Sequence, residues 1–131
     1  MIKTGLLHHV EIYVDDLDAT KIFWGWLLDL LGYSKYQEWD AGISYQNGDC
    51  YIVFVQTEER HRIPKYHRCR SGLNHLAFHA SKELIDAINV ELKARGISIL
   101  YENRHPYANG EDCYAVFFED PMRIKVELCA Y

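Results

Sequence analysis

The feature that most constrains the fold of this chain is an order of predicted elements that occurs twice along it. In the first half, residues 7–14 alternate between polar and apolar side chains, which predicts a strand. A helix is predicted next, because Asp16 or Asp18 can cap its first turn and Gly32 can end it. Three strands should follow, at 33–39, 42–46 and 50–56, with Asn47-Gly48 as the turn between the last two. The first half is therefore predicted to be a βαβββ module.

The second half repeats this order after a loop at residues 57–72. The pattern predicts a strand, a helix that Gly96 ends, and three more strands, at 73–80, 82–95, 97–101, 113–118 and 123–129. LHHV, which begins at residue 7, aligns with LNHL, which begins 66 residues later. DCYIVF at 49–54 and DCYAVF at 112–117 are also similar, but their offset of 63 residues falls out of order with the strands. We interpret this second similarity as a recurring hairpin.

Length and composition fit one globular domain built from the two modules. The chain has 131 residues, of which 49% are hydrophobic, and this is enough for a core of its own. We therefore predict a single α+β domain, with a first module at about 5–57, a linker at about 58–71 and a second module at about 72–131.

Charge, cysteine content and the N-terminal sequence argue against several classes of protein. The net charge of −5 gives no basic surface for nucleic acid or an anionic membrane. The N-terminal apolar run is too short for a signal peptide, and no window approaches the ~20 apolar residues of a membrane helix. The 4 cysteines form no CxxC pair, which favours free thiols. We expect a cytoplasmic protein that binds neither nucleic acid nor membranes.

Three of the predicted strands carry polar side chains opposite an apolar face, because successive side chains of a strand point to opposite sides. The apolar faces should contact the two helices, and they are formed by Val10, Ile12, Val14, Leu76, Phe78, Ile124, Val126 and Leu128. The opposite faces carry His9, His75 and Glu127. Two imidazoles and a carboxylate form the ligand set of an open metal site with free coordination positions. The alternative is that the histidines are hydrogen-bonded structural residues.

Three segments of the chain resemble the vicinal oxygen chelate superfamily, which includes glyoxalase I, bleomycin-resistance and fosfomycin-resistance proteins and ring-cleaving dioxygenases. They are LHHVEIYVDDLDATKIFWGWLLDLLGY, GLNHLAFHA and EDPMRIKVEL, and they occur in the family's order along nearly the whole chain. The resemblance implies paired βαβββ modules that form an eight-stranded curved sheet around a metal-binding cleft. It implies His9, His75 and Glu127 as ligands of a divalent ion (Ni, Zn, Mn or Fe) that binds two neighbouring oxygens of a small substrate.

The resemblance also bears on the reaction. Glyoxalase I adds a fourth ligand, usually glutamate, from the last strand of the first module, and CYIVFVQ places Phe54 at the matching position. A set of three ligands is more similar to the fosfomycin enzymes and the dioxygenases. We expect a glyoxalase-like lyase or isomerase, with ring cleavage or epoxide opening on the same metal as the alternative. A metal-free drug- or metabolite-binding protein, similar to the bleomycin-resistance proteins, is the third hypothesis.

Further residues are predicted to act on the substrate or to bind it. Glu11 and His79 lie on the same strand faces as the proposed ligands, with Glu11 ~7 Å from His9, and are the candidate catalytic residues. The alternatives are a salt bridge from Glu11 to Lys125 and a hydrogen-bonded core position for His79. The predicted substrate contacts are Phe54, Lys125, Arg68 and Arg70. The two arginines belong to a basic run between the modules, a candidate flap over an anionic substrate.

The helical segment KIFWGWLLDLL is apolar around most of its circumference. One side should cover its own sheet, and the other can lie in the core or against a second chain. The resemblance favours the second chain, because small members of the superfamily commonly form homodimers whose sites draw ligands from both subunits. His9 would then come from one subunit, and His75 with Glu127 from the other.

Overall fold

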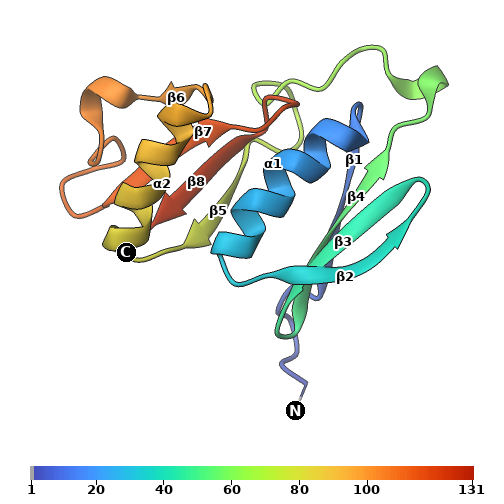
Figure 1. The fold of residues 1–131 in the computed structure, drawn as a ribbon, viewed down its shortest axis with the longest axis horizontal. Coiled ribbons are helices and arrows are strands. Elements are labelled where there is room, and N and C mark those ends of the chain that lie inside the picture. The colour runs from blue at the N-terminus through green and yellow to red at the C-terminus, as the bar shows by residue number, and fades with distance from the viewer. Residues whose placement is uncertain (1) are drawn as a thin grey trace. The chain divides into compact units, whose positions relative to one another are not determined.

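The computed structural model describes residues 2–131 and has two compact units, one ending at Lys65 and the other beginning at Tyr66. Each unit is a βαβββ module in which one long helix lies on a four-stranded sheet (Figure 1). The predicted α+β class and the duplicated module are therefore confirmed. The eight strands form two four-stranded sheets and not one sheet of eight.

The first unit contains the strands and the helix predicted for the first half of the sequence. Its elements are β1 (His9–Val14), α1 (Leu17–Leu30), β2 (Ser34–Trp39), β3 (Gly42–Asn47), β4 (Cys50–Gln56) and the short 3-10 helix η1 (Glu59–His61). The strands lie in the order β1-β4-β3-β2, and β1 runs parallel to β4 while the other neighbours are antiparallel. A parallel pair needs a long crossover, and α1 and the β2–β3 hairpin provide it.

Local sequence signals set the ends of α1, which covers one face of this sheet. The Asp16 side chain accepts a hydrogen bond from the Ala19 N–H at 3.0 Å and caps the first turn. Gly32 follows the helix with a φ of 90°, a left-handed conformation that costs glycine little. The helix buries Trp24 completely, and its ring stacks on Phe54 of β4 with the centroids 5.2 Å apart.

The second unit repeats the arrangement. Its elements are β5 (His75–His79), α2 (Lys82–Ala94), β6 (Ile99–Leu100), η2 (Glu102–Arg104), β7 (Ala115–Glu119) and β8 (Lys125–Cys129). The strands lie in the order β5-β8-β7-β6, with β5 parallel to β8. The Ser81 side chain caps α2 by accepting from the Leu84 N–H at 3.1 Å. Between α2 and the sheet lies an apolar core that includes Ile85, Ile88, Leu92, Phe118, Val126 and Leu128, each at most 1% exposed.

Two details of the sequence interpretation are refined by the strand order. DCYIVF covers β4 and DCYAVF leads into β7, but β4 occupies the place in its sheet that β8 occupies in the other. The similarity between them therefore does not mark equivalent strands, as their offset indicated. The strand predicted at 97–101 is only two residues long, because Tyr101 adopts a left-handed conformation with a φ of 56° and a 3-10 turn follows.

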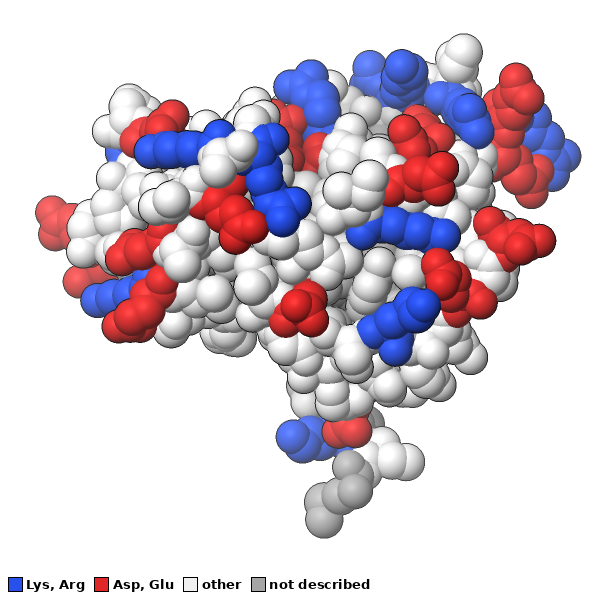
Figure 2. Space-filling model, viewed as in Figure 1, with Lys and Arg blue, Asp and Glu red and all other residues white. Residues whose placement is uncertain are grey.

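Surface and thiol properties agree with the composition. Acidic and basic side chains are interspersed over the face seen in Figure 2. All 4 cysteines are free thiols. Within residues 2–131, neither helix has the length and apolar character needed to cross a bilayer.

Candidate metal centre in the second unit

The parallel pairing of β5 with β8 brings two of the predicted ligands together. In this register His75 lies opposite Lys125, and Ala77 lies opposite Glu127. All four residues share one face of the sheet, while the other face of β8 packs into the core through Val126 and Leu128. His75 Nε2 lies 3.3 Å from Glu127 Oε1. The alternation of side chains predicted this shared face, and the register determines which of its members touch.

Asn74 fixes the orientation and the tautomer of the His75 imidazole. The Asn74 amide nitrogen donates to the Arg68 carbonyl at 3.0 Å, so the amide oxygen is the atom that faces His75. His75 Nδ1 lies 2.8 Å from that oxygen and must carry the proton that it accepts. In the neutral ring, Nε2 then has a bare lone pair, and it is aimed at the Glu127 carboxylate. Metal-bound histidines usually have this outer hydrogen bond.

Glu127 is a buried carboxylate held in place from its other side. The residue is 4% exposed, and its Oε2 accepts a hydrogen bond from the Tyr131 hydroxyl at 2.9 Å. Asn109 Nδ2 in turn donates to the same hydroxyl at 2.7 Å. The hydrogen bond to Glu127 raises the pKa of the Tyr131 phenol, so the phenol keeps its proton and remains a donor at neutral pH.

The pair His75–Glu127 has the chemistry of a cation site. When the imidazole is neutral, the lone pair of Nε2 faces a lone pair of the carboxylate oxygen 3.3 Å away. The two lone pairs repel each other, and a positive charge between them would relieve the repulsion. Within residues 2–131, no lysine or arginine forms an ion pair with Glu127. A divalent ion held between the two atoms would supply that charge.

A hollow of about 440 Å³ opens in front of this pair in the second unit. Its floor is the sheet, and its wall is the segment that follows β6 together with the C-terminal residue. The lining residues are His75, Tyr101, Arg104, Ala108, Asn109, Phe117, Lys125, Glu127 and Tyr131. The hollow is therefore small, mixed in polarity and open to a small molecule.

The third predicted ligand, His9, belongs to the first unit and lies on the polar face of β1. Its ring stacks on Tyr51 with the centroids 4.6 Å apart, and its Nδ1 lies 2.9 Å from His8 Nδ1. Glu11 is exposed on the same face of the strand, as the alternation predicts. Across the described part of the chain, no three His, Cys, Asp or Glu side chains gather as one metal-binding group. The second unit thus supplies two of the three predicted ligands side by side.

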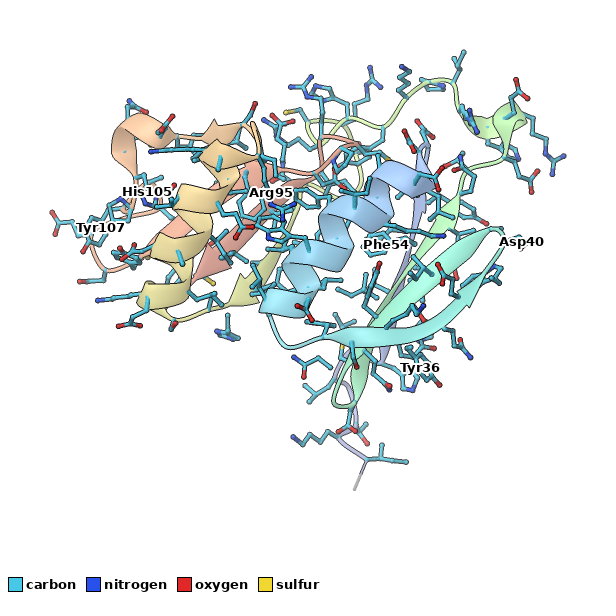
Figure 3. All side chains as sticks on the ribbon, viewed as in Figure 1. Tyr36, Asp40, Phe54, Arg95, His105 and Tyr107 are labelled. Atoms are coloured by element: carbon cyan, nitrogen blue, oxygen red, sulfur yellow. The ribbon has the colours of Figure 1, made fainter. Side chains whose placement is uncertain are left out.

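The prediction that Phe54 contacts the substrate is wrong. Phe54 pairs with Ile12 and lies on the core face of β4, beneath α1 (Figure 3). It has no exposed surface. The β4 residue that pairs with Glu11, and so shares the face of His9, is Val53. Neither Val53 nor Phe54 is a carboxylate, and the absence of a fourth ligand from this strand stays a prediction. The register of a parallel pair cannot be read from one strand, which explains the error.

The other predicted site residues are dispersed. Lys125 lines the hollow, but Arg68 is bound by Glu119 at 3.1 Å with its side chain only 16% exposed. Arg70 is an exposed residue of the segment that leads to β5. His79 lines a different hollow, beside Ser81 and Cys129.

Five residues near the His75–Glu127 pair were not predicted from the sequence: Asn74, Tyr101, Arg104, Asn109 and Tyr131. Two of them could have been suspected from their positions in the sequence. Asn74 immediately precedes His75, and Tyr131 follows Glu127 by the even spacing that keeps side chains on one face. The other three reach the hollow through the irregular segment after β6, whose course no strand or helix pattern describes.

Comparison with known protein sequences gives a consistent result. Residues 8–117 match the family model described as the Glyoxalase/Bleomycin resistance protein/Dioxygenase superfamily. The uncharacterized protein YqjT of Bacillus subtilis (strain 168) is 54% identical over 125 residues, which cover 95% of this chain and 98% of the relative. Glutathione transferase FosA of Serratia marcescens is 27% identical over 122 residues, which cover 93% of this chain and 78% of the relative.

Solved structures show the same fold. A candidate glyoxalase from Bacillus halodurans is 58% identical and superposes with a TM-score of 0.96, covering 98% of this chain and 97% of the other. The fosfomycin resistance protein FosX of Listeria monocytogenes, solved with Mn(II) and a sulfate ion, is 22% identical with a TM-score of 0.68, covering 98% of this chain and 91% of the other. The second likeness concerns the fold alone.

Proposed function

Because the chain belongs to the glyoxalase/bleomycin resistance protein/dioxygenase superfamily, we propose that it is a divalent-metal-dependent enzyme acting on a small oxygen-rich molecule. His75 and Glu127 would hold the ion from the second unit. His9 on β1 is proposed as the third ligand, contributed by the same chain or by a second copy in a homodimer. FosX, whose fold this chain shares, was solved with Mn(II), and this motivates the choice of a divalent ion in the proposal.

The single observation that carries this proposal is that Nε2 of His75, the ring nitrogen that Asn74 does not engage, lies 3.3 Å from the buried carboxylate of Glu127. Asn74 holds the imidazole in the tautomer that a metal needs, and Tyr131 holds the carboxylate. The donor set therefore fits a borderline ion such as Ni, Zn, Mn or Fe.

The reaction we favour is a lyase or isomerase step of the glyoxalase type. A bound ion would supply Lewis-acid polarisation to two neighbouring substrate oxygens. The chain's own residues would orient the substrate, because Lys125 with Tyr101 and Asn109 with Tyr131 form two hydrogen-bonded pairs that line the hollow. Glu11, exposed on the face that carries His9, is proposed as the group that takes a proton from the substrate.

A second reaction is favoured by the valine at the fourth ligand position. Val53 cannot act as a ligand or as a base, unlike the glutamate that glyoxalase I has there. A three-ligand ion suits an enzyme that opens an epoxide with an added nucleophile, and the glutathione transferase FosA is among the relatives. Ring cleavage on the same ion is the remaining alternative of this kind. A metal-free binding protein is the alternative of another class.

Elemental analysis separates the metal-dependent proposals from the binding protein. We expect about one divalent ion per chain after purification without chelators, and loss of that ion in His75→Ala. His79→Ala is the matched control, because His79 lies on the same strand but lines another hollow, and it should retain the ion. A wild-type protein that holds no ion and gains no stability from Ni²⁺, Mn²⁺, Zn²⁺ or Fe²⁺ would favour the binding protein.

The role of Glu11 is tested by Glu11→Gln, which preserves size and removes the basic carboxylate. In the reaction that an activity screen identifies, we expect turnover to fall by about 10²- to 10⁴-fold while the ion content is unchanged. Glu83→Gln, at an exposed acid in the first turn of α2, is the control and should keep full turnover. Equal turnover in Glu11→Gln and the wild-type protein would dismiss Glu11 as the base.

A further inference from the structure

We propose that Lys125 and Arg104, which both contact Tyr101, form with its hydroxyl a subsite for a small oxyanion in the second unit, so that the substrate carries a phosphonate, phosphate, sulfonate or carboxylate group. The inference rests on the proposed function and adds the substrate class to it. All three residues line the hollow that contains His75 and Glu127.

Lys125 is held where an anion next to the metal pair would meet it. It lies directly opposite His75 in the parallel register of β5 and β8, so the two side chains leave the sheet at neighbouring positions. Its ammonium lies 5.6 Å from the centre of the Tyr101 ring and 5.9 Å from that of Phe117, which directs the lysine across the floor of the hollow. Lys125 Nζ donates to the Tyr101 hydroxyl at 3.4 Å.

Tyr101 contacts both Lys125 and Arg104. Its ring packs edge-on against Phe117, and the Arg104 guanidinium lies 5.2 Å from the ring centre. Because Lys125 can only donate, the Tyr101 oxygen accepts that bond and its own proton is available to a ligand. Tyr101 also holds a left-handed φ of 56°, a conformation that non-glycine residues keep where the surrounding structure imposes it, often at functional sites.

Lys125 and Arg104 differ from most basic side chains of the second unit in having no acid partner in the part of the chain that the structure describes. Other basic side chains of the unit are engaged by acids: Arg68 and Arg123 by Glu119, Lys93 by Glu102 and Arg95 by Glu91. Lys125 and Arg104 contact aromatic rings instead, and neither forms an ion pair with any described residue. Among the described residues that line the hollow, Glu127 is the only carboxylate, and the proposed ion would neutralise it. With the ion bound, the hollow has an excess of positive charge that an anionic substrate would balance.

This assignment replaces the flap predicted from the basic run between the modules. Arg68 cannot meet a substrate without breaking its ion pair with Glu119, in which both side chains are largely buried. The oxyanion would therefore be bound by residues of the hollow, beside His75 and Glu127.

Binding of 2-hydroxyethylphosphonate, measured by calorimetry on the full chain with and without Mn²⁺, tests the subsite. We expect Lys125→Met and Arg104→Leu each to weaken binding about tenfold, while Mn²⁺ affinity stays within about twofold of wild type. Lys82→Met is the matched control, since Lys82 lies 5.4 Å from the Tyr114 ring centre in the same cation–π geometry but outside the hollow. It should bind the phosphonate as the wild-type protein does. Propane-1,2-diol, a neutral compound with neighbouring oxygens, should show no dependence on either cation.

The outcomes distinguish the subsite from the metal. If the wild-type protein binds Mn²⁺ and both cation variants bind the phosphonate as tightly as it does, the subsite is overturned and the metal site stands. If the wild-type protein binds no Mn²⁺ but its phosphonate affinity still falls in both variants, the subsite stands and the metal proposal fails. Absence of phosphonate binding in both the metal-free and the Mn²⁺-loaded protein overturns the subsite.

Discussion

Glu127→Gln is expected to abolish the stabilisation of the protein by Mn²⁺ while leaving the metal-free protein at least as stable as wild type. The glutamine amide has the shape of the carboxylate, so its oxygen can still accept from the Tyr131 hydroxyl. Its nitrogen can donate to the bare Nε2 of His75, which replaces two opposed lone pairs by a hydrogen bond. We expect the metal-free free energy of unfolding to be unchanged or raised by up to about 1 kcal/mol.

The loss of metal binding follows from the same substitution. A neutral amide is a poor ligand for a divalent ion beside an imidazole, and the affinity should fall more than the 10–100-fold typical of losing an outer hydrogen-bond partner. Thermal unfolding with and without excess Mn²⁺, together with elemental analysis, measures both effects. Glu111→Gln, at an exposed acid of the same unit, is the control and should be stabilised by Mn²⁺ as the wild type is. Equal stabilisation of Glu127→Gln and wild type would remove Glu127 from the ligand set.

Trp24→Ala is expected to lower the free energy of unfolding by about 3–5 kcal/mol. Trp24 has no exposed surface and stacks on Phe54, itself fully buried, between α1 and β4. Removing the indole leaves a cavity that a helix and a sheet fixed by their own hydrogen bonds cannot close. Urea unfolding followed by far-UV circular dichroism gives the change in free energy.

Ile22→Ala is the matched control, because Ile22 lies on the same helix and is 71% exposed. Its removal should change the free energy of unfolding by no more than about 0.5 kcal/mol. If Ile22→Ala were as destabilising as Trp24→Ala, the exposed side of α1 would be buried in solution, as the predicted homodimer requires. That outcome would make the self-association of the protein the next quantity to measure.

Most of the fold could be predicted from the sequence, because its signals are local. The caps at Asp16 and Ser81, the glycine after α1 and the Asn47-Gly48 turn act within a few residues, and they placed both helices and seven of the strands within about two residues of their observed ends. The predicted length of β6 was too great, because Tyr101 has a left-handed backbone conformation that is uncommon for tyrosine and cannot be expected from the sequence. The irregular segment after β6 escaped prediction for the same reason.

The candidate site was predictable only in the part that depends on alternation along a strand. Alternation put His75 and Glu127 on the polar faces of their strands, and the described second unit has them 3.3 Å apart. The same reasoning gave the wrong face for Phe54. The face on which a β4 residue lies depends on the β1 residue with which it pairs, and Phe54 pairs with Ile12 of the core face. Asn74 and Tyr131 could have been suspected from their spacing to the ligands, whereas Tyr101, Arg104 and Asn109 could not.

The sequence by itself determined the order of the elements, the duplication and the polar and apolar faces of the strands, because these depend on neighbours in the chain and on the pleat of a strand. Only the tertiary structure decided that Arg68 is neutralised by Glu119 while Lys125 and Arg104 have no acid partner among the described residues. It also decided that the His75 nitrogen that Asn74 does not engage faces a buried carboxylate. The pairing of charges and the tautomer of an imidazole depend on atoms that lie close in space and far apart in sequence.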